Sequence, residues 1–280
     1  MLDTQQYRLR DHVAQALTPM LIAITRDVSP SLAACELTHV ERTPIDVDLA
    51  ATQHRGYQRV LASLGCRVLV LEAEPTMPDA VFVEDVAVVL DEVAVMTRPG
   101  AESRRGEVAS VADVLRRYRP LRVIGSPGTL EGGDVLRIGR TLYVGQSGRT
   151  NADGIAQLGA LVAEFGYAVR AVPIRDCLHL KSAVTALNDD TVLLQPAWVD
   201  RESFDGYRII EVDAEEEHAA NVVRIGNHVV MPACFPRTWQ RLVDAGVEVT
   251  TVDVSELQKA EGAVTCCSLL FADLDAQRTP

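Results

Sequence analysis

One pattern of polar and apolar positions recurs along the chain. In each occurrence, a polar or charged residue precedes a β-branched apolar run, a tight turn and a second apolar run. The pattern begins at five positions, which are Glu84, Glu131, His179, Asn221 and Cys266. Successive positions are 47, 48, 42 and 45 residues apart. A regular interval of this size indicates a chain built from similar structural repeats.

Each repeat is predicted to form a β-hairpin, a helix and a third strand. The turns fall at 91–92, 139–140, 188–190 and 226–227, where the residues accept tight hairpin geometry. Apolar residues three and four positions apart predict helices over 51–66, 110–120, 152–166 and 236–246. Gly166 and Gly246 follow the last turns of two of these, where a helix needs a stop. Single strands are expected next, as at 66–72, 167–174 and 247–254.

The repeats predict a closed ring. The unit of strand, strand, helix and strand occurs nearly five times, and residues 20–29 are expected to complete the last sheet by pairing with residues 266–271. Rotation of the units about one axis would bring the equivalent strand starts to the centre. The sequence therefore predicts an α/β fold in which residues 1–280 form a single domain.

Composition and charge narrow the classes of function. With 48% hydrophobic and 24% charged residues, the chain is neither disordered nor fibrous, and no apolar run approaches the length of a membrane span. The net charge of −12 argues against a nucleic-acid partner and suits a cationic small molecule. The polar start of the chain carries no targeting pattern, so we expect a cytoplasmic protein. Its six cysteines show no zinc-type spacing, and neither a metal nor another cofactor is expected.

The residues expected at the centre are chemically suggestive. A thiol, an imidazole and two carboxylates are the groups that nucleophilic catalysis on a cationic substrate requires. A buried cysteine or a single histidine is more often structural, but here both occupy equivalent positions in successive repeats. Asn221, at the head of the fourth repeat, has no catalytic role that the sequence assigns.

Six segments, in order, resemble the dimethylarginine dimethylaminohydrolase family. They are MPDAVFVEDVAVV (77–89), MTRPGAESRRGEV (96–108), LEGGDVL (130–136), YVGQSGRTNADG (143–154), LHLKSAV (178–184) and GAVTCCSL (262–269). This family belongs to the guanidine-modifying superfamily of five-bladed α/β-propellers, which also contains arginine deiminase. The resemblance implies such a propeller, and hydrolysis of Nω-methylated arginine to citrulline and dimethylamine or methylamine, without a cofactor.

The resemblance also implies three catalytic residues. Cys266 occupies the first position of the family's Cys-x-Ser segment and corresponds to the nucleophile. His179 corresponds to the general acid and base, and Glu131 to the carboxylate that holds the guanidinium and orients the histidine. Cys267 is expected to point the other way along the strand, as a packing residue.

Further residues correspond to substrate contacts. Glu84 and Asp85 fall on carboxylates near the guanidinium, whereas Arg104 and Arg149 match the pair that holds the α-carboxylate. The amine contacts implied are the Asp79 carboxylate and the backbone carbonyls of Ala260 and Leu37. Asp134 is left open, because LEGGD also reads as a turn before a strand.

Two alternatives stay open. An arginine deiminase-like hydrolase of arginine or another guanidine would share this core, although those enzymes usually carry a helical insertion for which this chain has no room. A non-catalytic propeller that binds a partner should lack one of the thiol, the imidazole and the acids, and all are present here. The sequence leaves monomer and homodimer open, as it does the preference among methylated arginines and the motion of the loop around residues 30–45.

Overall fold

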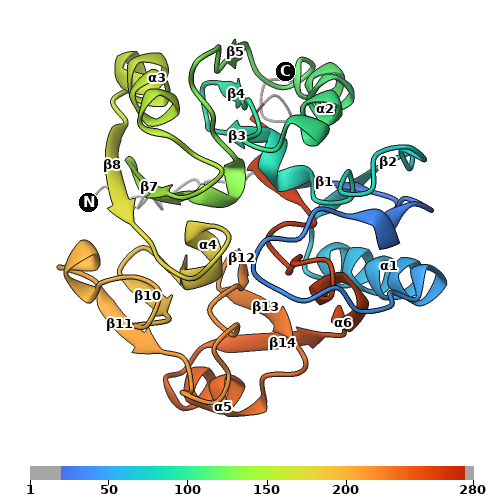
Figure 1. The fold of residues 1–280 in the computed structure, drawn as a ribbon. Coiled ribbons are helices and arrows are strands. Elements are labelled where there is room, and N and C mark those ends of the chain that lie inside the picture. Colours follow the sequence, from blue (N-terminus) through green and yellow to red (C-terminus); the bar gives the residue numbers. More distant parts are fainter. Residues whose placement is uncertain (1–19, 275–280) are drawn as a thin grey trace, which may run out of the picture.

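The ring of repeats is present in the structure, a computed structural model that describes residues 20–274. These residues form five three-stranded sheets around a central axis (Figure 1). In every sheet, the middle strand pairs antiparallel with one neighbour and parallel with the other. The predicted five-bladed α/β-propeller is therefore confirmed. The domain was predicted to span residues 1–280. Its two ends, residues 1–19 and 275–280, lie outside the described part of the chain.

The sheets follow one another in chain order. The first four are β3–β4–β5 (Ala87–Val89, Ala94–Met96, Leu121–Val123), β6–β7–β8 (Val135–Ile138, Thr141–Gln146, Ala168–Pro173), β9–β10–β11 (Val184–Ala186, Thr191–Leu194, Arg208–Glu211) and β12–β13–β14 (Val223–Ile225, His228–Pro232, Glu248–Val252). The fifth joins the two ends of the described chain as β15–β1–β2 (Leu269–Ala272, Leu21–Arg26, Arg67–Leu71). Leu21 pairs with Ala272 and Ile24 with Leu269, so the ring is closed as the sequence predicted.

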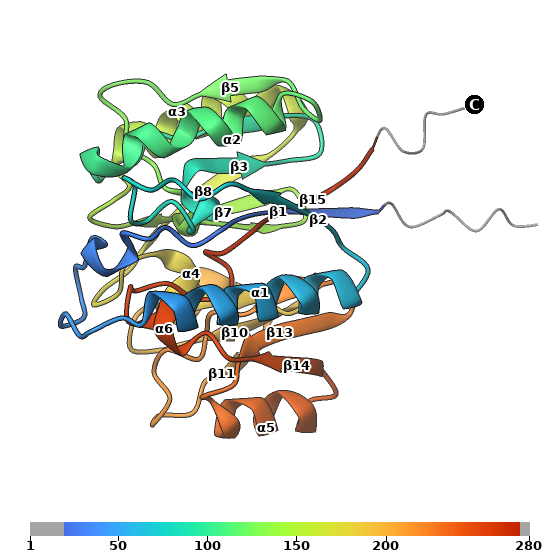
Figure 2. The same cartoon turned by 90° about the vertical axis from the view of Figure 1, so that its right-hand side faces the viewer.

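Helices cover the outer parts of four units (Figures 1 and 2). They are α1 (Val47–Ser63), α2 (Val108–Leu115), α3 (Ala152–Val162) and α5 (Pro236–Asp244). Gly166 and Gly246 have φ angles of 76° and 83°, the left-handed conformation expected after a helix. The unit of β9, β10 and β11 has only the 3₁₀ turn η6 (Arg201–Phe204) in the place of its helix.

Helix α1 begins earlier than the apolar spacing predicted. The observed start is Val47 rather than residue 51, because the Asp46 side chain accepts a hydrogen bond from the Leu49 backbone N–H at 2.9 Å. An aspartate cap satisfies a donor that would otherwise be unpaired in the first turn. The helix then packs its buried face, which includes Tyr57 and Leu61, into one of the apolar clusters of the core.

The first strand of every unit lies nearest the axis. Residues of β3, β6, β9, β12 and β15 line one central cavity. Short helical turns precede three of these strands, namely η2 (Val83–Val86), η4 (Gly132–Asp134) and α4 (Leu180–Ala183). The predicted convergence of the strand starts is therefore observed, and the polar residues lie in the turns just before the strands. No helix in the described residues is long and apolar enough to cross a membrane.

Candidate active site

A small cavity at one end of the axis brings most of the predicted site residues together. Seven of them contribute to its lining: Asp79, Asp85, Arg104, Arg149, His179, Ala260 and Cys266. The remaining three do not line it, although Glu131 touches it indirectly through His179. Glu84 faces the central cavity instead, and Leu37 is half-buried and packs against a core cluster. Residues from units far apart in the sequence thus share one enclosed space.

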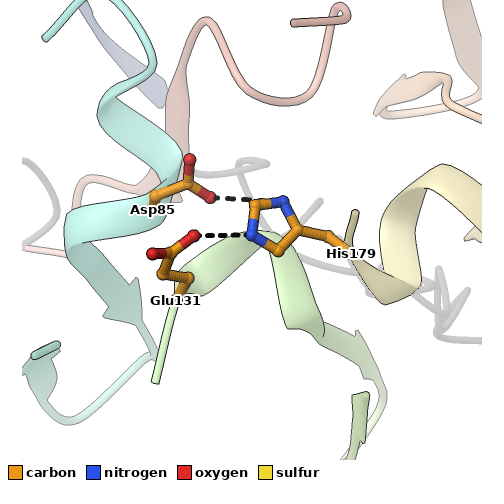
Figure 3. Close-up of side chains that lie close together, drawn as sticks. All are labelled: Asp85, Glu131 and His179. Atoms are coloured by element: carbon orange, nitrogen blue, oxygen red, sulfur yellow. Dashed lines mark hydrogen bonds and ion pairs between the residues drawn. The ribbon is translucent and has the colours of Figure 1, made fainter. Parts of the chain in front are cut away.

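Two carboxylates, of Asp85 and Glu131, approach the same side of the His179 ring (Figure 3). Its Nε2 is 2.6 Å from Oε2 of Glu131, and its Nδ1 is 3.9 Å from Oδ1 of Asp85. Burial opposes the charged imidazolium, but the carboxylates of Asp85, Asp134 and Glu131 outweigh burial and raise the pKa of His179 to about 9. The imidazole is therefore protonated at neutral pH.

Glu131 is held in a fixed orientation behind the histidine. Its side chain is fully buried, and its Oε1 accepts the backbone N–H of Gly100 at 3.1 Å. Arg149 Nη1 is 3.6 Å from the same oxygen. Although burial disfavours the carboxylate, the hydrogen bond from His179 and the positive charges nearby lower the pKa of Glu131. The carboxylate thus stays ionised and orients the imidazole.

Gly133, the second glycine of LEGGD, allows His179 and Asp85 to approach each other. A Cβ added to Gly133 would lie 2.6 Å from His179 Nδ1 and 2.7 Å from Asp85 Oδ1. The Gly133 N–H also donates to Asp85 Oδ1 at 3.0 Å. Only glycine fits between the imidazole and the carboxylate. The glycine that forms the turn therefore also lets His179 lie close to Asp85.

The same three groups could be considered as metal ligands. Ligand atoms of Asp85, Glu131 and His179 lie within 4.8 Å of one another. However, the guanidinium of Arg104 is only 2.6 Å from Asp85, and the Nε2–Oε2 distance at Glu131 is that of a hydrogen bond. These contacts favour a protonated imidazole over a divalent cation, and the absence of a metal stays a prediction.

Cys266 lies in a tightly supported turn. The Tyr57 hydroxyl donates to the Val264 carbonyl at 2.8 Å, and the Asn221 side chain accepts the Thr265 N–H at 3.0 Å. Burial, followed by the charges of Glu84 and Asp85, raises the pKa of Cys266 to about 12. The sulfur is consequently a thiol at neutral pH when the cavity holds no cation.

Cys267 is a packing residue, but not for the reason predicted. Cys266 and Cys267 lie in a turn before β15, so strand alternation does not separate them. Cys267 is fully buried in an apolar core cluster, and its Sγ lies 3.3 Å from the Ala263 carbonyl oxygen.

Arg104 is almost fully engaged by the protein. Its guanidinium donates to Asp85 at 2.6 Å, to both oxygens of Glu107 and to the backbone carbonyls of Asp79 and Phe82. These carboxylates keep the pKa of Arg104 well above its usual value despite burial. Arg149 has fewer partners: one terminal nitrogen donates to Thr38 Oγ1 at 3.0 Å, and the other lies 3.6 Å from Glu131. Arg149 is therefore the freer of the two cations.

Glu84 forms a buried ion pair close to Cys266. Its Oε1 lies 2.5 Å from Nζ of Lys181, and its backbone N–H donates to the Cys266 carbonyl at 3.2 Å. Burial raises the pKa of Glu84, and the lysine offsets this only in part. Glu84 thus acts on the sulfur through its charge rather than from the cavity lining.

The sequence matches one known protein family over most of its length. A family model described as N,N dimethylarginine dimethylhydrolase, eukaryotic, matches residues 39–271. The chain belongs to the dimethylarginine dimethylaminohydrolase family. The resemblance carried by its six segments is confirmed, and with it the expectation of a hydrolase.

Relatives in this family match nearly the whole chain. A Streptomyces coelicolor protein named N(G),N(G)-dimethylarginine dimethylaminohydrolase is 45% identical over 91% of this chain and 99% of its own. A structure of the Pseudomonas aeruginosa dimethylarginine dimethylaminohydrolase, a cysteine-to-serine variant with citrulline, has a TM-score of 0.86 and 36% identity over 90% of this chain and all of that one. A second structure, a histidine-to-glycine variant of a dimethylarginine dimethylaminohydrolase as an adduct with S-methyl-L-thiocitrulline, has a TM-score of 0.87 and 35% identity over 91% of this chain and all of that one.

Several residues of the site were not identified from the sequence. The dimethylarginine dimethylaminohydrolase segments contain Phe82 and Gly262, which line the cavity, and Glu107, which pairs with Arg104. The three-residue spacing of Arg104 and Glu107 was an available signal, although the sequence predicted no helical turn there; the structure has the 3₁₀ turn η3 (Glu102–Glu107). Glu36 and Glu261 also line the cavity, and nothing in the sequence pattern marks them.

The two residues left open have structural contacts. Asp134 is fully buried and accepts the Leu180 N–H at 2.9 Å, directly after His179. Asn221 donates to the Lys181 carbonyl at 3.0 Å and to the Thr265 hydroxyl at 2.9 Å. Asp134 thus supports the histidine turn, and Asn221 joins that turn to the cysteine turn.

Proposed function

We propose that this protein hydrolyses Nω-methylated L-arginine to L-citrulline and dimethylamine or methylamine. The observation that carries the proposal is the shared cavity in which the Cys266 thiol and the His179 imidazolium meet the Asp85 carboxylate. A nucleophile, a proton donor and a fixed negative charge are the groups that substitution at a guanidinium carbon needs. The names of the relatives, and citrulline in one related structure, support this substrate class.

The substrate itself supplies part of the activation. A guanidinium carbon is a weak electrophile because its charge is shared by three nitrogens, so the attacking sulfur must be a thiolate. With a pKa of about 12, Cys266 is protonated in the free protein. A bound guanidinium beside Glu84 and Asp85 neutralises the charges that oppose ionisation, and this lowers the pKa of the thiol.

The first half-reaction forms and breaks one bond at the same carbon. The Cys266 thiolate attacks the guanidinium carbon and gives a tetrahedral adduct. The His179 imidazolium, whose pKa is raised to about 9, protonates the methylated nitrogen. The C–N bond then breaks, the amine leaves, and a thiouronium remains on the sulfur.

The second half-reaction returns the protein to its starting form. Neutral His179 takes a proton from water, and the hydroxide attacks the thiouronium carbon. The C–S bond breaks and the sulfur leaves as a thiolate. The added hydroxyl gives up its proton to form the citrulline carbonyl, and the thiolate takes up that proton. Glu131, bonded to Nε2 at 2.6 Å, orients the imidazole in both steps. Neither a metal nor an organic cofactor takes part in this scheme.

The amino-acid end of the substrate is assigned to the other lining groups. Arg149 and the unused N–H of Arg104 bind the α-carboxylate, and Arg149 is the freer of the two. Asp79 and the carbonyl of Ala260 accept hydrogen bonds from the α-amine, together with the carbonyl of Leu37. Leu37 is the weakest of these assignments, because the residue does not line the cavity.

We also propose that residues 1–280 act as one catalytic domain. The pairing of β1 with β15 supports this, because the chain cannot be divided without opening the ring. We propose that its substrate is a small cationic amino acid and that it acts in the cytoplasm.

The test compares substrates and variants in one assay. Purified protein is incubated separately with asymmetric dimethylarginine and with arginine, and citrulline and dimethylamine are quantified. Equal amounts of citrulline and dimethylamine, with much slower turnover of arginine, are expected. Cys266→Ser should abolish the reaction, whereas the matched Cys267→Ser should retain it. Faster turnover of arginine would replace the proposal with the deiminase-like alternative.

A further inference from the structure

Glu261 occupies a position where glycine is the favoured residue. The short helix α6 (Ser255–Gln258) ends with the Gly262 N–H bonded to the Leu257 carbonyl at 3.0 Å and the Glu261 N–H bonded to the Gln258 carbonyl at 3.1 Å. This hydrogen-bond pair places the intervening residue in the left-handed conformation, and Glu261 has a φ of 56°. A side chain is strained there, and a strained residue beside a functional cavity suggests a role for its side chain.

The side chain of Glu261 binds a distant loop. Its Oε2 accepts the Thr38 N–H at 2.8 Å and its Oε1 accepts the Val40 N–H at 2.8 Å. The His39 N–H also donates to Oε1. One carboxylate therefore collects three consecutive backbone N–H groups from a loop more than 220 residues earlier in the chain. Hydrogen bonds to a charged acceptor are stronger than those between neutral groups.

That loop contacts the site at two further points. The Glu36 N–H donates to Asp79 Oδ2 at 3.1 Å, and Arg149 donates to the Thr38 hydroxyl at 3.0 Å. Leu37, whose carbonyl is assigned to the α-amine, lies between these anchors. Glu261 also follows Ala260, the second carbonyl assigned to the same amine. Loop, amine contacts and Glu261 thus form one connected unit.

We propose that Glu261 is a positioning residue that holds residues 38–40 beside the cavity, and with them Leu37 and Glu36, and so completes the binding site for the α-amine. This inference rests on the proposed function for the identity of the ligand. Glycine would adopt the left-handed conformation after α6 without strain, but it has no carboxylate to bind residues 38–40. The contact with the loop therefore explains why a strained glutamate occupies this position. Gly262 cannot take the role over, since a Cβ there would lie 2.1 Å from the Phe82 ring.

The decisive variant is Glu261→Gly, which gives α6 its favoured residue and removes the carboxylate. We expect KM for asymmetric dimethylarginine to rise by about 10-fold or more, with kcat changed by less than about 3-fold. Backbone amides of residues 38–40 should exchange with deuterium faster than in the unmodified protein. Glu261→Gln, which keeps the strain and loses the charge, should show the same two changes in weaker form.

Asp176→Gly is the matched control. Asp176 also has a left-handed φ, of 53°, and is exposed. It lines a neighbouring cavity with His39 and Val40, but it makes no hydrogen bond to residues 38–40 and does not line the cavity that contains Cys266. This change relieves the same kind of strain and should leave KM and the exchange of residues 38–40 unaltered. For an analogue of the substrate without its α-amine, the KM penalty of Glu261→Gly should shrink to less than about 2-fold.

Two outcomes would overturn the proposal. If Glu261 serves only to end α6, Glu261→Gly leaves both KM and amide exchange unchanged. An equal KM penalty with the analogue that lacks the amine would also contradict it. Amide exchange needs no turnover, so it still tests the loop contact should the protein fail to hydrolyse methylated arginine.

Discussion

The Nε2 atom of His179 lies 2.6 Å from Oε2 of Glu131, and this contact joins two neighbouring units of the ring. Each residue stands immediately before the short helical turn that begins its unit. The contact therefore depends on the repeat, which brings equivalent positions to the axis. Burial alone would lower the pKa of His179, but the charges of Asp85 and Asp134, together with this contact to Glu131, raise it to about 9.

Glu131→Gln should shift the pH dependence of catalysis. Without this carboxylate the pKa of His179 falls from about 9, so the protonated form is lost at a lower pH. Since His179 acts first as an acid, kcat/KM should decline at lower pH than in the unmodified protein, and kcat should fall by about 100-fold. A pH–rate profile measures both. Glu164→Gln, at an exposed carboxylate, is the control, and an alkaline limb that stays in place would remove Glu131 from its role.

Glu84→Gln should make the free thiol more reactive. The charge of Glu84 is the largest influence after burial that raises the pKa of Cys266, and its loss leaves Lys181 as an unopposed cation. The rate of alkylation by iodoacetamide at pH 8 should rise by about 10-fold for each unit by which the pKa falls. KM for the cationic substrate should rise as well. Lys181→Met, which removes the positive charge, should not accelerate alkylation, and an acceleration there would contradict the electrostatic explanation.

Asn221→Ala should separate the two catalytic turns. The side chain donates to the Lys181 carbonyl and to the Thr265 hydroxyl, and it accepts the Thr265 N–H. Truncation leaves buried polar groups unpaired, so the free energy of unfolding should fall by about 1–3 kcal/mol. Chemical denaturation measures this loss, and kcat should fall with it. Asn188→Ala, at an exposed hairpin turn, should change both quantities far less.

The sequence predicted the ring because each unit is specified locally. Turn residues such as Gly139 and Gly226 adopt the positive φ angles that tight hairpins need, and apolar periodicity located the outer helices. Helix α1 began earlier than predicted because its start is set by Asp46, a capping residue that apolar spacing does not detect. The repeat pattern predicts a helix in every unit, but the unit of β9–β11 has only the 3₁₀ turn η6.

The motifs predicted most of the residues that share the cavity, but they did not predict the partners of those residues. Arg104 was expected to be open to a carboxylate, and the structure shows it bonded to Asp85 and Glu107. Glu84 was expected near the guanidinium, and it pairs with Lys181 beside the sulfur. The Glu84–Lys181 pair joins residues from different units, and Arg104 reaches Asp85 across 19 positions of the chain, so no local pattern predicts either contact. The Glu261 contact with residues 38–40 is of the same kind.

The most direct test of the proposed chemistry is to detect a covalent adduct on the sulfur of Cys266. The His179→Gly variant is incubated with S-methyl-L-thiocitrulline, whose methanethiol needs less protonation to leave than an amine, and the protein is analysed by mass spectrometry. Since hydrolysis requires the missing base, we predict a stable adduct of the substrate less methanethiol on Cys266. The adduct should persist with Cys267→Ser added and disappear with Cys266→Ser added. Failure to form any adduct, or an adduct on another cysteine, would contradict the account.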